Sequence, residues 1–320
     1  LILHTSLAVD PDCGQPFGVL WEKVWKRTHT VKPKKKANRA RPFEEKESYK
    51  WVEAIKKVPE ILQEASVNNE QKVIHVFDRE GDISEVFESV QKQSNCGLLV
   101  RATHNRSLCE QEDYLWNYLK KQPLQFEKEI ELPKNHKRKK RTALLAVRFC
   151  QVKLRSPQRC PETDSFNIYA VYAEEINPPE GEEAISWMLL TTEVVDTMES
   201  ANMILRWYSY RWLIEEYHKI LKSGCKVESY RLAGNSMEVL LGFLTTISGH
   251  LLRMTYLHRN HPDHPAEAIL TPVQIKVLKA KSSSTKTAKE VLTIQWAIEA
   301  IARLGGYLEH RRKTPIGITV

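Results

Sequence analysis

Two short apolar segments with a helical segment between them most strongly limit how this chain can fold. The segments "KVIHVF" (72–77) and "GLLVRA" (97–102) are runs of apolar residues with the length of a buried strand. Between them, "ISEVFESVQKQ" (83–93) has the pattern of a helix. This order is typical of a sheet covered by helices. We therefore expect a mixed α/β core in which 72–77 is a central strand.

The remaining segments divide the chain around this core. Residues 1–26 read as a strand hairpin, and 43–65 as a helix that Pro59 bends or divides. From 104 to 192 short β-like segments dominate, which suggests an inserted antiparallel sheet with one solvated face. Helical patterns then follow at about 197–222, 235–258, 272–279 and 287–303. We expect a first part of the core at 1–103, a β-rich insertion at 104–192, a helical part of the core at 193–260 and a helical C-terminal region at 261–320.

Composition narrows the class of partner. The chain has 320 residues and a formal net charge of +8, which favours a polyanion, most commonly nucleic acid. Its six cysteines form no C-x2-C pair, so we expect reduced thiols and no zinc site. No apolar run approaches the roughly 18 residues that span a membrane, and the first residues lack the features of a signal peptide. A cytoplasmic protein without a membrane partner is predicted.

A stripe of polar side chains marks the segment "YSYRWLIEEYHKILK" (208–222). On a helical wheel of about 100° per residue, Tyr208, Arg211, Glu215 and Lys222 fall within an arc of about 60°, opposite the apolar residues. A solvated face with an Arg211–Glu215 ion pair is one interpretation. It explains two of the four residues. A site for metal and phosphate explains all four, because Arg and Lys hold phosphates and a phenol donates to them.

A second carboxylate follows the first predicted strand directly. Asp78 begins "DREGD" (78–82), and ligands of open α/β sheets collect at the carboxyl ends of strands. The alternative is a helix N-cap, but Glu80 and Asp82 lie closer to the expected helix start. Paired with Glu215, Asp78 would hold Mg²⁺ ions about 3.5–4 Å apart for phosphoryl transfer. We therefore predict that both acids are catalytic and bind metal.

These motifs resemble those of a known family. The stripe fits a Y-x2-R-x3-E-x6-K signature, and "VFDREGDI" (76–83) resembles the second-aspartate motif of the same group. Together they resemble bacterial cut-and-paste DDE transposases of insertion-sequence family four, in the Tn-five-like branch. The resemblance covers nearly the whole chain. Further matching stretches are "EEKESYKW" (44–51), "AEEINPPEGEEAISWMLLT" (173–191) and "IQWAIEAIARLGG" (294–306).

The resemblance implies a fold, an activity and partners. The fold is an RNase H-like core with a β-rich insertion between the second and third catalytic acids, followed by a helical dimerisation region. The activity is hydrolysis and strand transfer at transposon ends, with Mg²⁺ or Mn²⁺ as cofactor. The implied partners are double-stranded DNA with inverted-repeat ends, target DNA and a second copy of the chain. The implied location is the bacterial cytoplasm, at the nucleoid.

The resemblance also carries individual roles to this chain. Asp78 becomes the second acid and Glu215 the third. Tyr208, Arg211, Lys222 and Arg101 match phosphate-contacting positions. Trp187 and Trp212 match aromatics beside a flipped base, which stacking suits. For Trp187, core packing is the alternative.

The chain departs from the family at its start. The first catalytic Asp of the family lies on a strand before the hairpin, upstream of residue 1, and Asp10 and Asp12 are expected turn formers. We therefore expect an excerpt of a longer transposase or a decayed remnant, inactive alone. Two alternatives are a DNA-binding or dimerising fragment that acts as an inhibitor, and an RNase H-class nuclease without a transposon. The basic stretches 31–41 and 133–141 are interpreted as DNA-backbone contacts or solvated loops.

Overall fold

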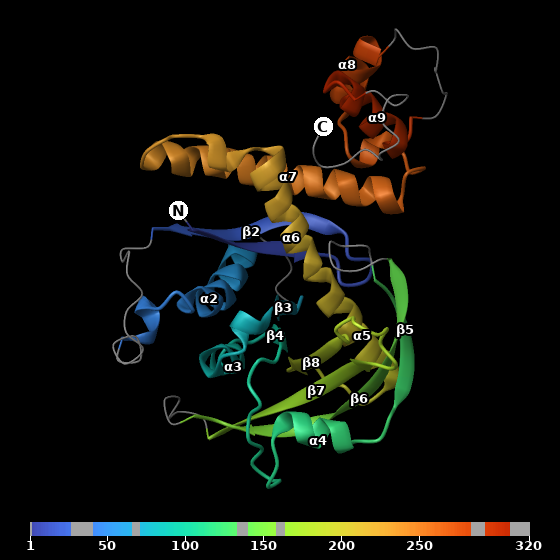
Figure 1. Ribbon diagram of the computed structural model, residues 1–320. Coiled ribbons are helices and arrows are strands. Elements are labelled where there is room, and N and C mark those ends of the chain that lie inside the picture. The colour runs from blue at the N-terminus through green and yellow to red at the C-terminus, as the bar shows by residue number, and fades with distance from the viewer. Residues whose placement is uncertain are drawn as a thin grey trace. The chain divides into compact units, whose positions relative to one another are not determined.

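The sheet expected from the two apolar segments is present in a computed structural model, which describes residues 2–26, 41–65, 71–132, 140–157, 164–282 and 292–307. The chain is a mixed α/β protein, as predicted (Figure 1). It forms two units, which are described separately. The sheet unit comprises the described residues within 27–211, and the helical unit those within 1–26 and 212–320. The chain passes from the sheet unit to the helical unit between Arg211 and Trp212.

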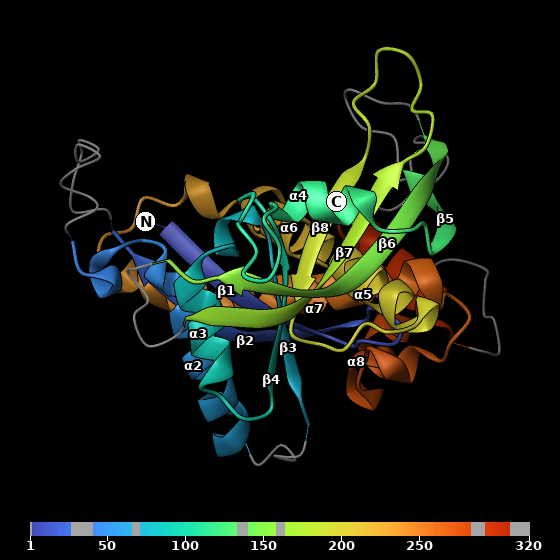
Figure 2. The ribbon, with the colours of Figure 1, turned by 90° about the horizontal axis from the view of Figure 1, so that it is seen from below.

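A curled sheet of six strands organises the sheet unit, and Figures 1 and 2 show its long strands β6 and β7 curving across it. The strand order is β3–β4–β8–β7–β6–β5. The strands are β3 (Val73–Phe77), β4 (Cys96–Arg101), β5 (Phe126–Leu132), β6 (Arg141–Arg155), β7 (Ser165–Glu175) and β8 (Ser186–Thr191). Only the β3–β4 pair is parallel among these, and helix α3 (Ser84–Gln91) connects its two strands. The segments 72–77 and 97–102 thus form the predicted strand–helix–strand unit.

The prediction that 72–77 is a central strand was wrong for the described residues. There β3 is an outer strand of the sheet and pairs with β4 alone. Its apolar character comes from burial of both its faces, because Phe77 packs on one side of the sheet and Ile74 and Val76 on the other. An apolar strand therefore indicates that both of its faces are covered. It does not indicate how many neighbouring strands it pairs with.

Helices cover both faces of the sheet. The helices α2 (Tyr49–Glu64), α3 and α4 (Leu115–Lys121) pack on one face, and α5 (Met198–Tyr210) packs on the other. Along β4, Leu98 and Val100 face the first group while Leu99 faces α5, and all three are fully buried. Burial of each such side chain contributes about 1.5–3 kcal/mol. Pro59 lies inside α2, so it does not divide this segment into two helices, and the bend at Pro59 stays a prediction.

The β-rich segment 104–192 joins the core sheet. Its strands β5 to β8 pair antiparallel with one another, as expected, and β8 also pairs antiparallel with β4 through Val100 and Leu190, so they belong to the same sheet as β3 and β4. The expected solvated face is present on the outer strand β5, where exposed and partly buried residues alternate. The part boundaries after 103, 192 and 260 stay predictions.

The helical unit combines the two ends of the chain. The predicted hairpin is confirmed as β1 (Ile2–Val9) and β2 (Pro16–Trp25), which pair antiparallel. In its turn, Oδ1 of Asp10 accepts hydrogen bonds from the backbone N–H groups of Asp12 and Cys13, at 2.8 and 3.1 Å, so Asp10 is a turn former as predicted. The helices are α6 (Trp212–Lys219), a π-helical turn (Ile220–Gly224), α7 (Asn235–Asn260), α8 (Pro272–Ser282) and α9 (Ile294–Leu304).

Two cores hold the helical unit together. In the first, Tyr217, Ile220 and Leu221 are buried with residues of α7, and Leu3 and Val24 of the hairpin pack against them. In the second, α8 and α9 share a small cluster around Ala297 and Leu278. No described helix of the chain is long and apolar enough to cross a membrane.

The single helix expected over 197–222 is interrupted twice. It ends at Tyr210, restarts at Trp212, and continues from Ile220 as a π-helical turn. A π-helix has more residues per turn than an α-helix, so the wheel of about 100° per residue does not hold at Lys222. The apolar face opposite the stripe was predicted correctly for Tyr217, Ile220 and Leu221, which are buried. Glu215 and Lys222 of the stripe are exposed.

Candidate nucleic-acid site

Asp78 lies at the carboxyl end of β3, as predicted. Its side chain is half-buried, and Oδ1 accepts a hydrogen bond of 2.8 Å from the backbone N–H of Glu80. Asp78 thus caps the short 3-10 helix Arg79–Gly81, whereas α3 begins after Ile83 without a side-chain cap. Within the described residues, Oδ2 of Asp78 makes no hydrogen bond or ion pair, so this hard oxygen donor fits a Mg²⁺ ligand.

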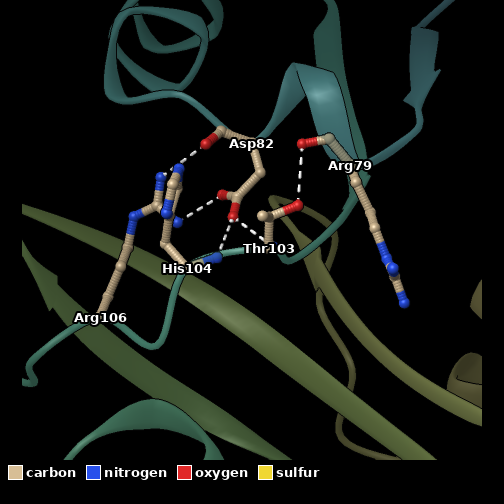
Figure 3. Close-up of polar contacts among 5 residues, drawn as sticks. All are labelled: Arg79, Asp82, Thr103, His104 and Arg106. Atoms are coloured by element: carbon tan, nitrogen blue, oxygen red, sulfur yellow. Dashed lines mark hydrogen bonds and ion pairs between the residues drawn. The ribbon is translucent and has the colours of Figure 1, made fainter.

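A buried carboxylate four residues later joins two loops (Figure 3). Asp82 is fully buried, and its Oδ2 accepts backbone hydrogen bonds from Thr103 at 2.6 Å and His104 at 3.0 Å. Its Oδ1 pairs with Arg106, which also donates to the Asp82 carbonyl at 3.0 Å. The Thr103 hydroxyl donates to the carbonyl of Arg79 at 3.0 Å. We call this arrangement the Asp82 clamp. It fixes the loop after β4 to the turn that carries Asp78.

Three guanidinium groups gather beside this turn. Arg101 ends β4 and donates a hydrogen bond of 2.8 Å to the carbonyl of Ser186. Burial lowers the pKa of Arg101, the nearby charges of Arg79 and Arg211 lower it further, and a hydrogen bond with Tyr208 opposes the shift. We call Arg79, Arg101 and Arg211 the arginine group. Neighbouring positive charges of this kind favour the binding of an anion such as a phosphate.

An aromatic pair borders the arginine group. Trp187 on β8 meets Tyr208 on α5 edge to face, with ring centroids 5.6 Å apart and planes at 65°. Tyr208 is buried, and Trp187 is partly buried against the same core. The core-packing interpretation of Trp187 therefore describes part of its surroundings. The roles of Trp187 in base stacking and of Tyr208 in phosphate binding stay predictions.

The helical unit carries the other predicted residues. Glu215 on α6 is exposed, and Trp212 has 57% of its surface exposed. Lys222 lies in the π-helical turn, where its Nζ is 3.6 Å from Oε1 of Glu228 and both side chains are exposed. The loose ion pair leaves Lys222 available to a phosphate, because exposed pairs contribute little.

His218 lies near Glu215 and Lys222 in the sequence, and sequence reasoning missed it. It lies between Glu215 and Lys222 on the same helical segment, three residues after one and four before the other. Burial lowers the pKa of His218, the charge of Lys222 adds to this, and Glu215 opposes it. The available signal was its spacing, because residues three and four apart on a helix are neighbours on its surface.

The structure thus collects the predicted residues into two groups, one in each unit. Asp78, Arg101, Trp187, Tyr208 and Arg211 belong to the sheet unit, and Trp212, Glu215 and Lys222 to the helical unit. The pairing of Asp78 with Glu215 across the units stays a prediction. Within the described part of the chain, no group of three His, Cys, Asp or Glu side chains is arranged to hold a metal ion.

Other basic residues are engaged in ion pairs. Most of the stretches 31–41 and 133–141 lies outside the described residues. At their described ends, Arg41 pairs with Glu45 at 3.6 Å and Lys140 with Glu131 at 3.0 Å. Arg141 forms a bidentate pair with buried Glu175, which joins strand β6 to β7, and its contact with DNA stays a prediction.

Sequence reasoning also missed Arg79 and the Asp82 clamp. Arg79 directly follows Asp78, and that adjacency was the available signal. The Asp82–Arg106 pair joins residues 24 positions apart, and no local pattern predicts it. No protein-family model matches the chain.

Proposed function

We propose that this chain is the core of a cut-and-paste DDE transposase of insertion-sequence family four, with an RNase H-like fold. The observation that carries the proposal is the placement of Asp78 beside the arginine group at one edge of a mixed sheet. A carboxylate with one oxygen available and several guanidinium groups are the groups that phosphoryl transfer on DNA requires. The Y-x2-R-x3-E-x6-K signature adds Glu215 as the second metal ligand of this chain.

The proposed reaction is a series of in-line displacements at phosphorus. Water attacks a phosphodiester at the transposon end, the P–O bond to the 3′ oxygen breaks, and a 3′-OH is released. That 3′-OH attacks the opposite strand to close a hairpin, water reopens it, and the freed end joins target DNA. Mg²⁺ bound by Asp78 and Glu215 would activate the attacking oxygen and stabilise the leaving oxygen.

The chain's own residues would position the DNA in these steps. Arg101 and Arg211 would hold non-bridging phosphate oxygens, and Lys222 would add a point charge from the helical unit. Trp187 would stack on the base that is unpaired when the hairpin closes, with Trp212 as the second aromatic. The proposed partners are transposon-end DNA, target DNA and a second copy of the chain, in the bacterial cytoplasm.

An alternative is a DNA-binding fragment without catalysis, which would act as an inhibitor. The arginine group favours it, because phosphate binding there needs neither carboxylate. The two functions separate in a nicking assay with Mg²⁺ on DNA that carries the element's ends, using the full-length protein.

In the transposase, Asp78→Asn and Glu215→Gln each abolish nicking while DNA binding persists. The matched control is Glu60→Gln, an exposed acid on α2, which leaves nicking unchanged. Nicking at the wild-type rate in Glu215→Gln would reject the enzyme. Cleavage that ignores end sequence and survives Trp187→Ala would instead indicate a general RNase H-class nuclease.

A further inference from the structure

A cavity of about 470 Å³ opens beside the turn that follows β3, within the sheet unit. This volume lies in the range of small-ligand sites, which is about 300–1,000 Å³. Three segments build the cavity: the start of α2, the turn 79–83 and the loop after β4. Its lining includes Lys50, Trp51, Arg79, Glu80, Ile83 and His104.

The Asp82 clamp makes two of these three segments rigid. It binds the backbone of Thr103 and His104 to the turn 79–83, as Figure 3 shows. Arg106 neutralises the buried Asp82, and its guanidinium also lies 5.3 Å from the centre of the Phe87 ring. The cavity wall is therefore preformed, and the Asp82 charge is not available to a ligand.

Lys50 presents a positive charge inside this wall. Its Nζ lies 4.9 Å from the centre of the Trp51 ring, and its side chain is only 20% exposed. The same Nζ donates to Oε2 of Glu80 at 3.1 Å, and the Glu80 side chain is 71% exposed. The exposed Glu80 carboxylate therefore occupies the position beside the Lys50 ammonium group that a phosphate oxygen of a ligand would take.

Arg79 connects the cavity to the arginine group. It is exposed, it lines the cavity, and its charge acts on Arg101. A DNA strand held by the arginine group would therefore continue toward the cavity. The partly exposed apolar side chain of Ile83 suits a sugar or a base, and the two cations suit the phosphate.

We propose that this cavity receives one nucleotide of the DNA strand next to the cleaved phosphodiester, with its phosphate held by Lys50 and Arg79. The proposal rests on the proposed function, because it takes DNA as the ligand. On binding, the phosphate displaces Glu80 from Lys50. Glu80 is thus an internal competitor of DNA, which gives opposite signs for substitutions at the two ends of one ion pair.

The test is DNA binding by the full chain without divalent metal, measured by fluorescence anisotropy on a labelled duplex of random sequence. Lys50→Met should weaken binding about tenfold. It should also make the slope of log K against log salt shallower by about 0.9, the value for one phosphate contact. Glu80→Gln should strengthen binding. Lys50→Arg should retain affinity, which separates loss of charge from loss of fold.

A second ion pair on the same helix supplies the control. Lys57 and Glu60 of α2 lie 2.6 Å apart, and both side chains are about half exposed, outside the cavity lining. Lys57→Met and Glu60→Gln change the same net charges and should leave affinity within twofold. Equal losses in Lys50→Met and Lys57→Met would overturn the proposal, as would unchanged or weaker binding by Glu80→Gln. Because no nicking is measured, a Lys50-specific loss in a protein that never nicks would reject the transposase and retain the cavity.

Discussion

At the residue scale, two acids of one motif have different surroundings. Asp78 and Asp82 both belong to "DREGD", but Asp78 is half-buried with one backbone hydrogen bond, while Asp82 is fully buried with three bonded partners. The sequence pattern identified Asp78 as a candidate because it directly follows a predicted strand. It did not predict the role of Asp82, since that role depends on Arg106 in a loop reached only after β4.

We predict that the same substitution lowers the free energy of unfolding strongly at Asp82 and hardly at all at Asp78. Asp82→Asn removes a buried charge and leaves Arg106 unpaired, which should lower the free energy of unfolding by about 3 kcal/mol. Asp78→Asn should change it by less than about 0.5 kcal/mol, because Asn is an equally good cap. Urea titrations followed by circular dichroism measure both values. A similar loss in the two variants would show that the clamp does not stabilise the fold.

His75 on β3 should make stability depend on pH. It is buried against Phe77, and burial lowers its pKa from 6.5 to about 4. Between these values the unfolded chain binds a proton that the folded chain does not. The free energy of unfolding should therefore fall by about 1.4 kcal/mol for each pH unit below 6.5.

The variant His75→Phe should lose this dependence, because Phe has no titrating group. Urea titrations at a series of pH values between 7 and 4 measure the difference between wild type and variant, which cancels the carboxylates that titrate in both. Parallel curves for wild type and His75→Phe would contradict the assignment.

At the element scale, hydrophobic patterns predicted the strands of the core and most helices. β3 and β4 begin and end within one residue of the apolar segments 72–77 and 97–102. The patterns failed where packing changes the helix itself. The break at Arg211 and the π-helical turn at Ile220–Gly224 lie in a segment whose sequence reads as one helix. The pattern at 104–192 predicted antiparallel strands but not the pairing of β8 with β4, because alternation does not specify which strand is the neighbour.

Besides apolar packing, a polar contact joins α6 to the hairpin. The buried Tyr217 hydroxyl donates to Oε1 of Glu22 at 2.9 Å, and the Thr5 hydroxyl donates to the same oxygen at 3.1 Å. Tyr217→Phe should lower the free energy of unfolding of the helical unit by about 1.5–3 kcal/mol, the range for a hydrogen bond to a charged group. Hydrogen exchange of the β1 and β2 amides measures the effect.

A double-mutant cycle isolates this contact from general damage. Glu22→Gln in the Tyr217→Phe background should cost less than Glu22→Gln alone, by more than about 0.5 kcal/mol. Tyr230→Phe is the matched control, because that ring is 45% exposed, and it should leave exchange unchanged. Additive costs in the cycle would show that Tyr217 and Glu22 act independently.

At the scale of the whole molecule, the first 26 residues fold with the C-terminal third of the chain. The Tyr217–Glu22 contact joins residues 195 positions apart, and the hairpin residues Leu3 and Val24 pack on the core of the helical unit. Local patterns predicted the hairpin but assigned it to the first part of the core, since periodicity carries no information on distant partners. The two groups of predicted site residues are divided in the same way, between the sheet unit and the helical unit.

This division predicts how pieces of the chain behave. Residues 41–211 contain the whole six-stranded sheet and both of its helix-covered faces, so this piece should fold alone and unfold cooperatively in urea. Residues 212–307 lack the hairpin that covers Tyr217 and Ile220, so they should not unfold cooperatively. Joining residues 2–26 to 212 through a flexible Gly/Ser linker should restore a cooperative transition, which far-UV circular dichroism detects. A cooperative transition in 212–307 without the hairpin would contradict the assignment of the hairpin to this unit, because its core would then be complete in the C-terminal helices alone.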